Sequence, residues 1–280
     1  MGTRTYTTVA QYFIQDDPEA SEQEFGGVPP RFGLKDDSDD RWEKFKGKIE
    51  MLNSSEQPTT QYKVIFLGRH GQGYHNVAMA KYTTQCCVRS WTRLDGNGEL
   101  VWGPDPALTD LGLEQARDAN RAWKEELAYK IPLPEKLYCS PLRRAIKTNQ
   151  LTFEGLLEPG LKTTIVEIIR EKNGVSTCDK RRRRSEIQED FPEYLWEDGF
   201  AEEDETWDAD IRETPRELDC RATKVLDMIF DKDEELVISI TSHHGFIDAF
   251  LRVCVHRPWD LPTGGIIPIV VRAEKQVVLN

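Results

Sequence analysis

The residues best suited to catalysis in this sequence are histidines, arginines and one glutamate that follow predicted strands. They fall into four groups: Arg69-His70-Gly71, Ser140-Pro141-Leu142-Arg143-Arg144, Arg170-Glu171 and Ser242-His243-His244-Gly245. An arginine guanidinium stays charged and binds phosphate oxygens through two parallel hydrogen bonds. A neutral imidazole can attack phosphorus and form a phosphohistidine. The combination therefore indicates phosphoryl transfer.

The same residue types provide the other roles that this reaction needs. A second imidazole can donate hydrogen bonds to the phosphoryl oxygens and stabilise their charge. A carboxylic acid can protonate the leaving alkoxide and then activate the incoming water or alcohol. No glycine-rich nucleotide loop is present, and the six cysteines have no metal-type spacing. We therefore expect no cofactor and no metal.

Predicted strands and helices alternate along the chain, which would bring these groups together. An apolar run over 62–68 reads as a buried strand, and further strands are predicted at 136–139, 163–169, 236–240 and 266–271. Helices are predicted at 41–52, 105–130, through 144–148, and at 218–230. This order predicts an α/β fold, a three-layer α-β-α sandwich with a mostly parallel central sheet. In such a sheet the active site lies at the carboxyl ends of the strands.

The chain is expected to hold one catalytic domain over 61–280. Residues 1–60 are acidic and irregular, but their aromatic residues indicate an extension that packs on the body. These aromatics include Tyr12, Phe13, Phe25, Phe32, Trp42 and Phe45. A polar and aromatic segment over about 172–215 is predicted to be an inserted cap that covers the site.

The composition limits the partners of the chain. With 37 basic and 49 acidic residues, the net charge of −12 repels nucleic acid and anionic membranes at long range. No stretch approaches the roughly 20 apolar residues that span a bilayer. Residues 1–20 lack the apolar run of a secretory signal. We therefore expect a cytoplasmic protein, with a nuclear location as the alternative. The sequence gives no signal for an oligomeric state.

Several sequence elements, taken in order, resemble the histidine phosphatase superfamily, also called phosphoglycerate mutase-like. They are Arg69-His70-Gly71 with Asn76, Leu108-Thr109-Asp110-Leu111-Gly112-Leu113-Glu114-Gln115-Ala116, Ser140-Pro141-Leu142-Arg143-Arg144-Ala145, Arg170-Glu171 and Ser242-His243-His244-Gly245. The chain is most similar to fungal phosphomutase-like members, in which Arg-Glu is followed by a Cys-Asp-Lys-Arg element. That element is Cys178-Asp179-Lys180-Arg181 here.

The resemblance implies a role for each matching residue. It makes His70 the nucleophile and Glu171 the proton donor, with Arg69, Arg144 and the second histidine as phosphate ligands. Asn76 would order the phosphate pocket. Adjacent arginines and adjacent histidines leave alternatives: the spacing favours Arg144 over Arg143, and the fungal-type spacing favours His243 over His244.

Other residues near these motifs are candidates for substrate contacts. They are Gln72, Tyr74, His244 and Arg181. His75 could also contact a substrate, but a local hydrogen bond near a helix start explains it more simply. The basic run 180–184 could be a solvated face, a nuclear-import-like patch or part of the pocket rim.

These observations predict a metal-independent hydrolase of small phosphomonoesters that works through a phosphohistidine at His70. A phosphomutase is the alternative within the same chemistry, since the two differ in whether water or a second hydroxyl accepts the phosphoryl group. Two other possibilities are a phospho-ligand binding protein without catalysis and a pocket recruited for another reaction. The sequence does not identify the substrate.

Overall fold

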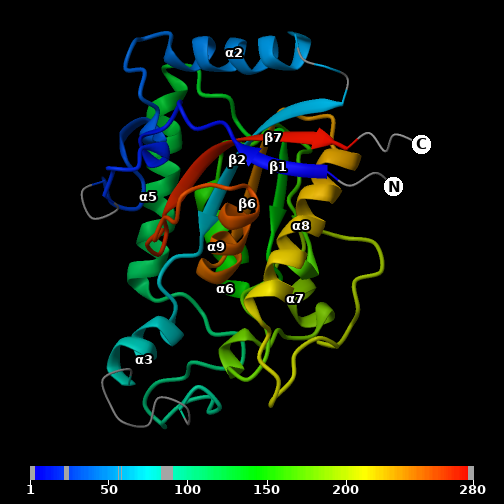
Figure 1. The fold of residues 1–280 in the computed structure, drawn as a ribbon. Coiled ribbons are helices and arrows are strands. Elements are labelled where there is room, and N and C mark those ends of the chain that lie inside the picture. Colours follow the sequence, from blue (N-terminus) through cyan, green and yellow to red (C-terminus); the bar gives the residue numbers. More distant parts are fainter. Residues whose placement is uncertain (1–3, 22–24, 56, 58, 83–90, 277–280) are drawn as a thin grey trace.

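The structure is a computed structural model that describes the chain except residues 1–3, 22–24, 56, 58, 83–90 and 277–280. Among the described residues, seven strands form one sheet. They are β1 (Arg4–Thr8), β2 (Thr60–Arg69), β3 (Lys136–Cys139), β4 (Thr164–Ile165), β5 (Leu195–Trp196), β6 (Val237–Ser242) and β7 (Ile266–Lys275). Their order is β1-β7-β2-β6-β3-β4-β5 (Figure 1). The strands from β2 to β5 in this order pair in parallel, whereas β7 pairs antiparallel with β2 and β1.

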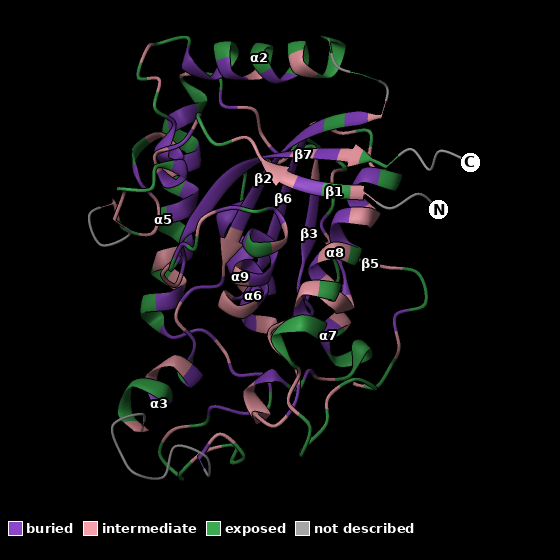
Figure 2. Ribbon diagram, in the orientation of Figure 1, coloured by how far each residue is buried: buried purple, intermediate pink, exposed green. Residues whose placement is uncertain are grey.

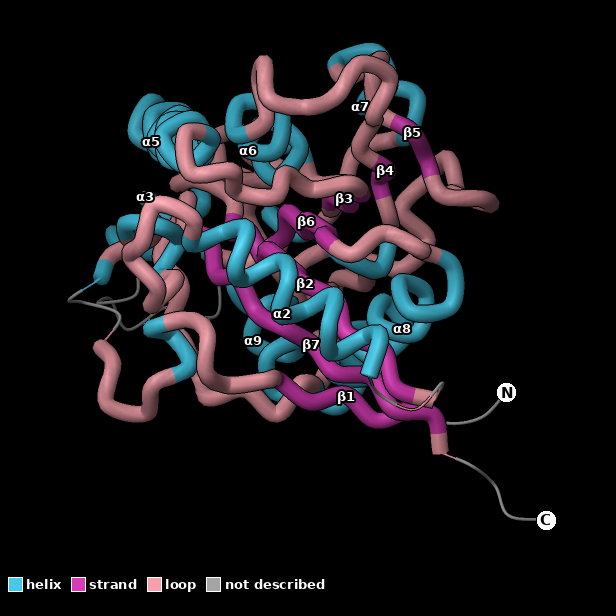
Figure 3. The backbone as a smooth tube through the Cα atoms, turned by 90° about the horizontal axis from the view of Figure 1, so that it is seen from above, coloured by secondary structure: helices cyan, strands magenta, loops and turns pink. Residues whose placement is uncertain are grey.

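Helices lie on both sides of this sheet, as the view from above makes clear (Figure 3). The α-helices are α2 (Arg41–Ser55), α3 (Tyr74–Tyr82), α5 (Asp110–Leu127), α6 (Arg143–Thr152), α7 (Arg184–Asp190), α8 (Pro215–Lys232) and α9 (His244–Val253). Short 3-10 helices are η1 (Ile14–Asp16), η2 (Pro30–Gly33), η3 (Glu167–Ile169) and η4 (Thr177–Asp179). The fold is thus the predicted three-layer α/β sandwich with a mostly parallel sheet.

The central strand β2 is buried on both faces, and its side chains alternate between two cores. Ile65 and Leu67 pack with residues of α8 and α9. Val64 and Phe66 pack on the opposite face with residues of α2 and α5. Because successive side chains of a strand point to opposite faces, a continuous apolar run is what a strand covered on both sides requires. Figure 2 shows the central strands buried along most of their length.

Two predicted elements differ from the structure. The strand predicted over 163–169 is only the two-residue β4, followed by the turn η3, in which the Ile169 N–H donates to the Val166 carbonyl. A short apolar run fits a buried segment of either shape, so its pattern alone did not separate them. The helix predicted over 105–130 starts at Asp110. Thr109 caps it by accepting the Gly112 N–H, while Asp105 has a positive φ of 44° that no α-helix contains.

The segment before β2 contributes to the sheet and to the core. Its strand β1 extends the sheet beside β7, and the helix predicted over 41–52 is present as α2. Trp42, Phe45 and Ile49 of α2 are buried in the core that contains Phe66. A bidentate contact joins Arg41 to Glu126 of α5, at 2.9 and 3.1 Å. The division into an extension and a catalytic domain at residue 60 stays a prediction.

The segment 172–215 holds η4, α7 and the edge strand β5. In Figure 1, α7 and α3 lie beyond the lower end of the sheet, where β2 and its parallel neighbours end. Cys86 and Cys87 lie outside the described residues. In the part of the chain that the structure describes, no helix is long and apolar enough to cross a membrane.

Candidate active site

The register of the neighbouring parallel strands β2 and β6 brings His70 and His243 together. Arg69 of β2 pairs with Ser242 of β6, so the next residue of each strand is a histidine at the same level. The His70 N–H donates to the Ser242 carbonyl at 3.0 Å, and the two ring centroids lie 4.9 Å apart. Both side chains are buried. The predicted convergence at the strand ends is therefore present.

The imidazole of His70 is held in one orientation and one tautomer. Its Nδ1 lies 2.7 Å from the carbonyl oxygen of Gly71. Because a carbonyl only accepts, the proton sits on Nδ1 and the lone pair sits on Nε2. Burial, followed by the charges of Arg144 and Arg69, lowers the pKa of His70 well below its usual value. His70 is therefore a neutral imidazole with Nε2 available as a nucleophile.

The adjacent histidines His243 and His244 occupy different environments. His243 is fully buried, and its Nε2 lies 2.7 Å from the hydroxyl of Ser140 at the end of β3. Its Nδ1 is buried without a hydrogen-bond partner among the described residues. The side chain of His244 is 41% exposed and lies 3.3 Å from Asp248. The structure thus brings His243 against His70 and leaves His244 at the rim.

Two arginines place unpaired donors next to this pair. Arg69 donates from Nη1 to the Leu261 carbonyl at 2.7 Å, and Arg144 donates from Nη1 to the Cys178 carbonyl at 2.7 Å. The Nε of each is buried without a partner among the described residues. Burial lowers the pKa of Arg69, but an arginine remains charged. Two guanidiniums that each keep a free Nε–H beside His70 are the kind of donors that bind an anion.

The carboxylate of Glu171 is fixed from two sides. It accepts the Lys172 N–H at 2.8 Å and the Gly245 N–H, at the start of α9, at 3.4 Å. Arg221 of α8 holds the backbone behind it, with Nη2 donating to the Glu171 carbonyl at 3.0 Å. The carboxylate is therefore next to the helix that follows His243.

The loop after His70 depends on close backbone contacts. A Cβ on Gly71 would lie 2.2 Å from the Gly112 carbonyl oxygen, so the loop can rest on the start of α5 only with glycine there. Asn76 accepts the Gly73 N–H at 2.9 Å, and Gln72 accepts the Thr109 hydroxyl at 2.9 Å. The Tyr74 side chain is partly exposed.

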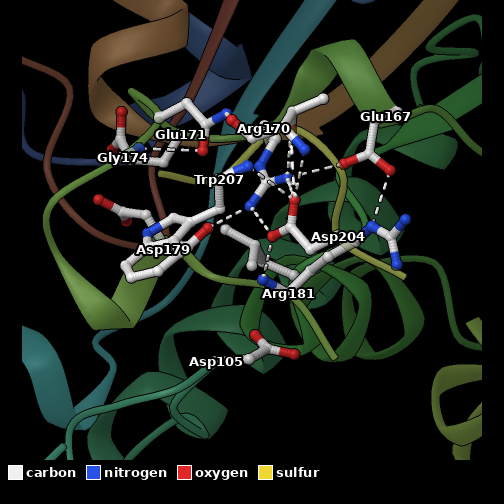
Figure 4. A network of polar contacts seen from close by, with 12 residues as sticks. Asp105, Glu167, Arg170, Glu171, Gly174, Asp179, Arg181, Asp204 and Trp207 are labelled. Atoms are coloured by element: carbon white, nitrogen blue, oxygen red, sulfur yellow. Dashed lines mark hydrogen bonds and ion pairs between the residues drawn. The ribbon is translucent and has the colours of Figure 1, made fainter. Parts of the chain in front are cut away.

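Each member of the basic run 180–184 has a partner or a ring contact. Arg181 is buried in the cap, where its five N–H donors serve Glu167 and the carbonyls of Ala201, Arg182, Glu202 and Glu203. Lys180 lies over the Trp207 ring, Arg182 reaches Asp105 at 3.4 Å, Arg183 pairs with Glu203, and Arg184 lies over Trp196. Figure 4 shows part of this network, in which Arg181 contacts Glu167 and Arg170 contacts both Glu167 and Asp204. The run is largely internal to the cap, although Arg183 is exposed.

A family model for the histidine phosphatase superfamily (branch 1) matches residues 65–266, which hold all of these residues. The chain belongs to the histidine phosphatase superfamily. Two fungal relatives cover nearly the whole chain. It is 40% identical to a protein of Arthroderma benhamiae named "Probable phosphoglycerate mutase", over 96% of this chain and 85% of the relative. It is 35% identical to "Phosphomutase-like protein 3" of Candida albicans, over 96% of this chain and 80% of the relative.

Solved structures with a related backbone include two phosphatases. The vanadate complex of mycobacterial glucosyl-3-phosphoglycerate phosphatase is 19% identical with a TM-score of 0.47, over 76% of this chain and 98% of that one. The ecdysone phosphate phosphatase of Bombyx mori, bound to tungstate, is 15% identical with a TM-score of 0.49, over 74% of this chain and 88% of that one.

Three residues outside the predicted catalytic set lie next to it in this superfamily member. Ser140 bonds His243, Asp179 bonds Arg144 at 3.2 Å, and the ring of His75 lies 5.2 Å from that of His70. Ser140 and Asp179 belong to sequence elements that resemble the family, and this membership was the sequence signal that could have identified them. The local hydrogen bond predicted for His75 is absent, because its Nδ1 is buried without a partner among the described residues.

Proposed function

We propose that this superfamily member is a phosphomonoester hydrolase that acts on a small phosphorylated metabolite through a phosphohistidine at His70. The observation that carries the proposal is the neutral imidazole of His70, fixed by the Gly71 carbonyl and surrounded by unpaired buried donors. Those groups are Arg69 Nε, Arg144 Nε and His243 Nδ1, which carries the ring proton when the Ser140 hydroxyl donates to His243 Nε2. Three donors around one nucleophile match the three oxygens of a phosphoryl group.

The reaction would proceed in two steps. Nε2 of His70 attacks phosphorus, a P–N bond forms, and the ester P–O bond breaks while protonated Glu171 gives its proton to the leaving alkoxide. Ionised Glu171 then takes a proton from water, whose oxygen attacks phosphorus and breaks the P–N bond. The products are an alcohol and inorganic phosphate, and His70 is regenerated. Arg69, Arg144 and His243 stabilise the phosphoryl oxygens in both steps.

The other predicted residues have supporting roles in this proposal. Asn76 orders the loop of the phosphate pocket, and Gln72, Tyr74 and His244 lie on segments that could contact the rest of the substrate. Arg181 has no free N–H donor in the structure, so a substrate contact through it would require the cap to rearrange.

The test is hydrolysis of p-nitrophenyl phosphate in the presence of a chelator, between about pH 4.5 and 8. We expect turnover by the parent that vanishes in His70→Ala and is inhibited by vanadate, and a phosphorylated His70 when the reaction is quenched. His256→Gln is the matched control, since this buried histidine pairs with Asp16 and not with the site. Equal rates for the parent and His70→Ala would refute the proposal.

A phosphomutase is the second candidate, and the names of the two fungal relatives support it. Here a hydroxyl of the substrate, rather than water, would take the phosphoryl group from His70. Incubation with 3-phosphoglycerate separates the two candidates. Release of inorganic phosphate supports the hydrolase, whereas conversion to 2-phosphoglycerate without phosphate release supports the mutase.

A further inference from the structure

A third imidazole lies beside the predicted nucleophile. His75 is the second residue of α3, and its ring centroid is 5.2 Å from that of His70, with the two planes tilted by 52°. The side chain is buried, with 6% of the residue exposed. It reaches the site from α3, whereas the residues proposed to bind the phosphoryl group come from the ends of β2 and β6 and from α6.

His75 differs from the other histidines in having no polar partner. Each of the other four histidines, all within the described residues, makes a hydrogen bond or an ion pair: His70 with Gly71, His243 with Ser140, His244 with Asp248, and His256 with Arg257 and Asp16. For His75 no such contact is found in the described part of the chain, and its Nδ1 is buried. A buried imidazole without a polar partner lacks hydrogen bonds that a bound ligand would restore.

The charge state of His75 limits what that ligand can be. Burial, followed by the charges of Arg144, His70 and Arg69, lowers its pKa well below the usual value, so the ring is neutral. A neutral imidazole has one N–H donor and one acceptor nitrogen. It can therefore bind a hydroxyl through either nitrogen, or a carboxylate through its N–H.

In the proposed mechanism the phosphoryl oxygens already have donors. Arg69 Nε, Arg144 Nε and His243 Nδ1, all buried without a partner among the described residues, would each serve one oxygen. A fourth neutral donor would thus serve another part of the substrate. The part nearest to the reacting centre is the leaving group, immediately beyond the ester oxygen.

We propose that His75 is a substrate-binding residue whose free ring nitrogen hydrogen-bonds a hydroxyl or carboxylate on the leaving group, next to the transferred phosphoryl group. The inference rests on the proposed function and narrows its substrate to phosphate esters of hydroxylated or carboxylated alcohols. A site built to bond a polar group discriminates strongly against an analogue that lacks it, because its own polar atom is then left unpaired.

Gly73 keeps the His75 ring in this position. A Cβ at Gly73 would lie 2.6 Å from Nδ1 and 2.7 Å from Cε1 of His75. An alanine there would displace the ring while leaving its chemistry intact. Gly73→Ala is therefore a second variant that perturbs the same contact without removing the imidazole.

The experiment compares two phosphate esters. Glycerol 2-phosphate has a hydroxyl on each carbon that flanks its ester carbon, whereas p-nitrophenyl phosphate has none. We expect His75→Phe to lower the ratio of kcat/KM for glycerol 2-phosphate to that for p-nitrophenyl phosphate by roughly 10-fold, the effect of one lost hydrogen bond. Gly73→Ala should lower the ratio in the same direction. His75→Gln, which restores a donor and an acceptor, should recover part of it.

If His75→Phe left the ratio of the two kcat/KM values unchanged, the inference would be overturned. This holds whether the activities toward both esters fall together or stay at the parental level. So would a parent that hydrolyses p-nitrophenyl phosphate but not glycerol 2-phosphate. A parent that hydrolyses neither ester would instead contradict the proposed function. His256→Gln should keep the parental ratio, because His256 lies outside the site and pairs with Asp16.

Discussion

Asp179 links Arg144 to the cap. One carboxylate oxygen accepts from Arg144 Nη2 at 3.2 Å, and the other accepts from Arg212 Nη1 at 2.9 Å. The Asp179 backbone carbonyl accepts from Arg170, and the preceding carbonyl of Cys178 accepts from Arg144 Nη1. The 172–215 segment therefore fixes the guanidinium that is proposed to bind the phosphoryl group, and Figure 4 shows Asp179 within this network.

Asp179→Asn is expected to lower kcat by about 10- to 100-fold, because a small displacement of a group that binds the transition state has effects of that size. The variant keeps the shape of the side chain but loses one acceptor and the negative charge between Arg144 and Arg212. Steady-state kinetics with p-nitrophenyl phosphate measure the change, and thermal unfolding measures the accompanying loss of stability.

Asp204→Asn is the matched control for that experiment. Asp204 is a buried aspartate of the same cap that pairs with Arg170, and Arg170 outweighs the effect of burial and lowers the pKa of Asp204 to about 2. Within the described residues Asp204 makes no hydrogen bond or ion pair with Arg144, so Asp204→Asn should reduce stability with a smaller fall in kcat. Equal falls in both variants would mean that Asp179 acts only by holding the cap together.

The three clustered histidines should make the fold sensitive to mild acid. Burial lowers the pKa of His70, His75 and His243 well below the usual value of 6.5. In the unfolded chain the same rings take up protons as the pH falls through about 6.5, so the unfolded state gains protons that the folded state does not. Stability is therefore greatest above this pH and decreases below it, by up to about 1.4 kcal/mol per pH unit for each histidine.

His75→Phe isolates one of these contributions. Buried carboxyl groups with a raised pKa, such as Asp105, act in the opposite direction, so the difference between parent and variant is the useful quantity. As the pH falls from about 6.5 to 5, the free energy of unfolding should decrease less steeply for the variant than for the parent. The difference in slope should correspond to the uptake of about one proton fewer on unfolding. Urea denaturation at several pH values measures it, and parallel curves for the two proteins would contradict the shift assigned to His75.

Much of the site followed from sequence because it depends on strand order and register. The apolar run of β2 and the run of β6 identified buried parallel strands, and the polar residues after them had to meet at one edge. What the sequence could not provide was side-chain geometry. The sequence left His243 and His244 as alternatives because the side chains of adjacent residues point in different directions. Which of the two points toward His70 depends on where β6 ends and α9 begins.

The cap was harder to predict for a different reason. Among the described residues its one strand, β5, has two residues. Buried ion pairs such as that of Asp204 with Arg170, which precedes the cap, join residues far apart in the chain. Neither feature has a periodic pattern. For the basic run 180–184 the sequence left a solvated face, a nuclear-import-like patch and the pocket rim as alternatives, and none of them predicted that Arg181 is internal. Likewise β1 is a short edge strand whose pairing with β7 leaves no local signal.

Glu126→Ala should destabilise the fold by about 3–5 kcal/mol, because it leaves the buried Arg41 without its counter-charge. It also removes the acceptor of the Trp42 indole N–H, so α2 loses two contacts with α5. Glu114→Ala on the same helix breaks only exposed pairs with Arg117 and Arg121 and should destabilise the fold far less. Urea denaturation measures the free energy of unfolding of both variants. Similar losses in Glu126→Ala and Glu114→Ala would show that the packing of α2 does not depend on the ion pair between Arg41 and Glu126.

Arg181→Ala should loosen the cap, whereas Arg183→Ala should leave it intact. The Arg181 side chain is 1% exposed, pairs with Glu167 at 2.7 Å and lies over the Phe200 ring. Removing it leaves four part-buried carbonyls without their donor and leaves Glu167 paired with Arg170, at a cost of about 1–3 kcal/mol. Arg183 and its partner Glu203 are both 61% exposed, so their pair contributes less than about 1 kcal/mol.

Amide hydrogen exchange over 172–215 measures this difference directly. Faster exchange in Arg181→Ala, with parental rates in Arg183→Ala, is the expected result, because local opening follows the loss of buried contacts. If the two variants exchanged alike, the basic run would be a surface feature and the internal contacts of Arg181 would not hold the cap. Since the same cap holds Arg144 through Asp179, Arg181→Ala should also lower kcat for p-nitrophenyl phosphate, and Arg183→Ala should not.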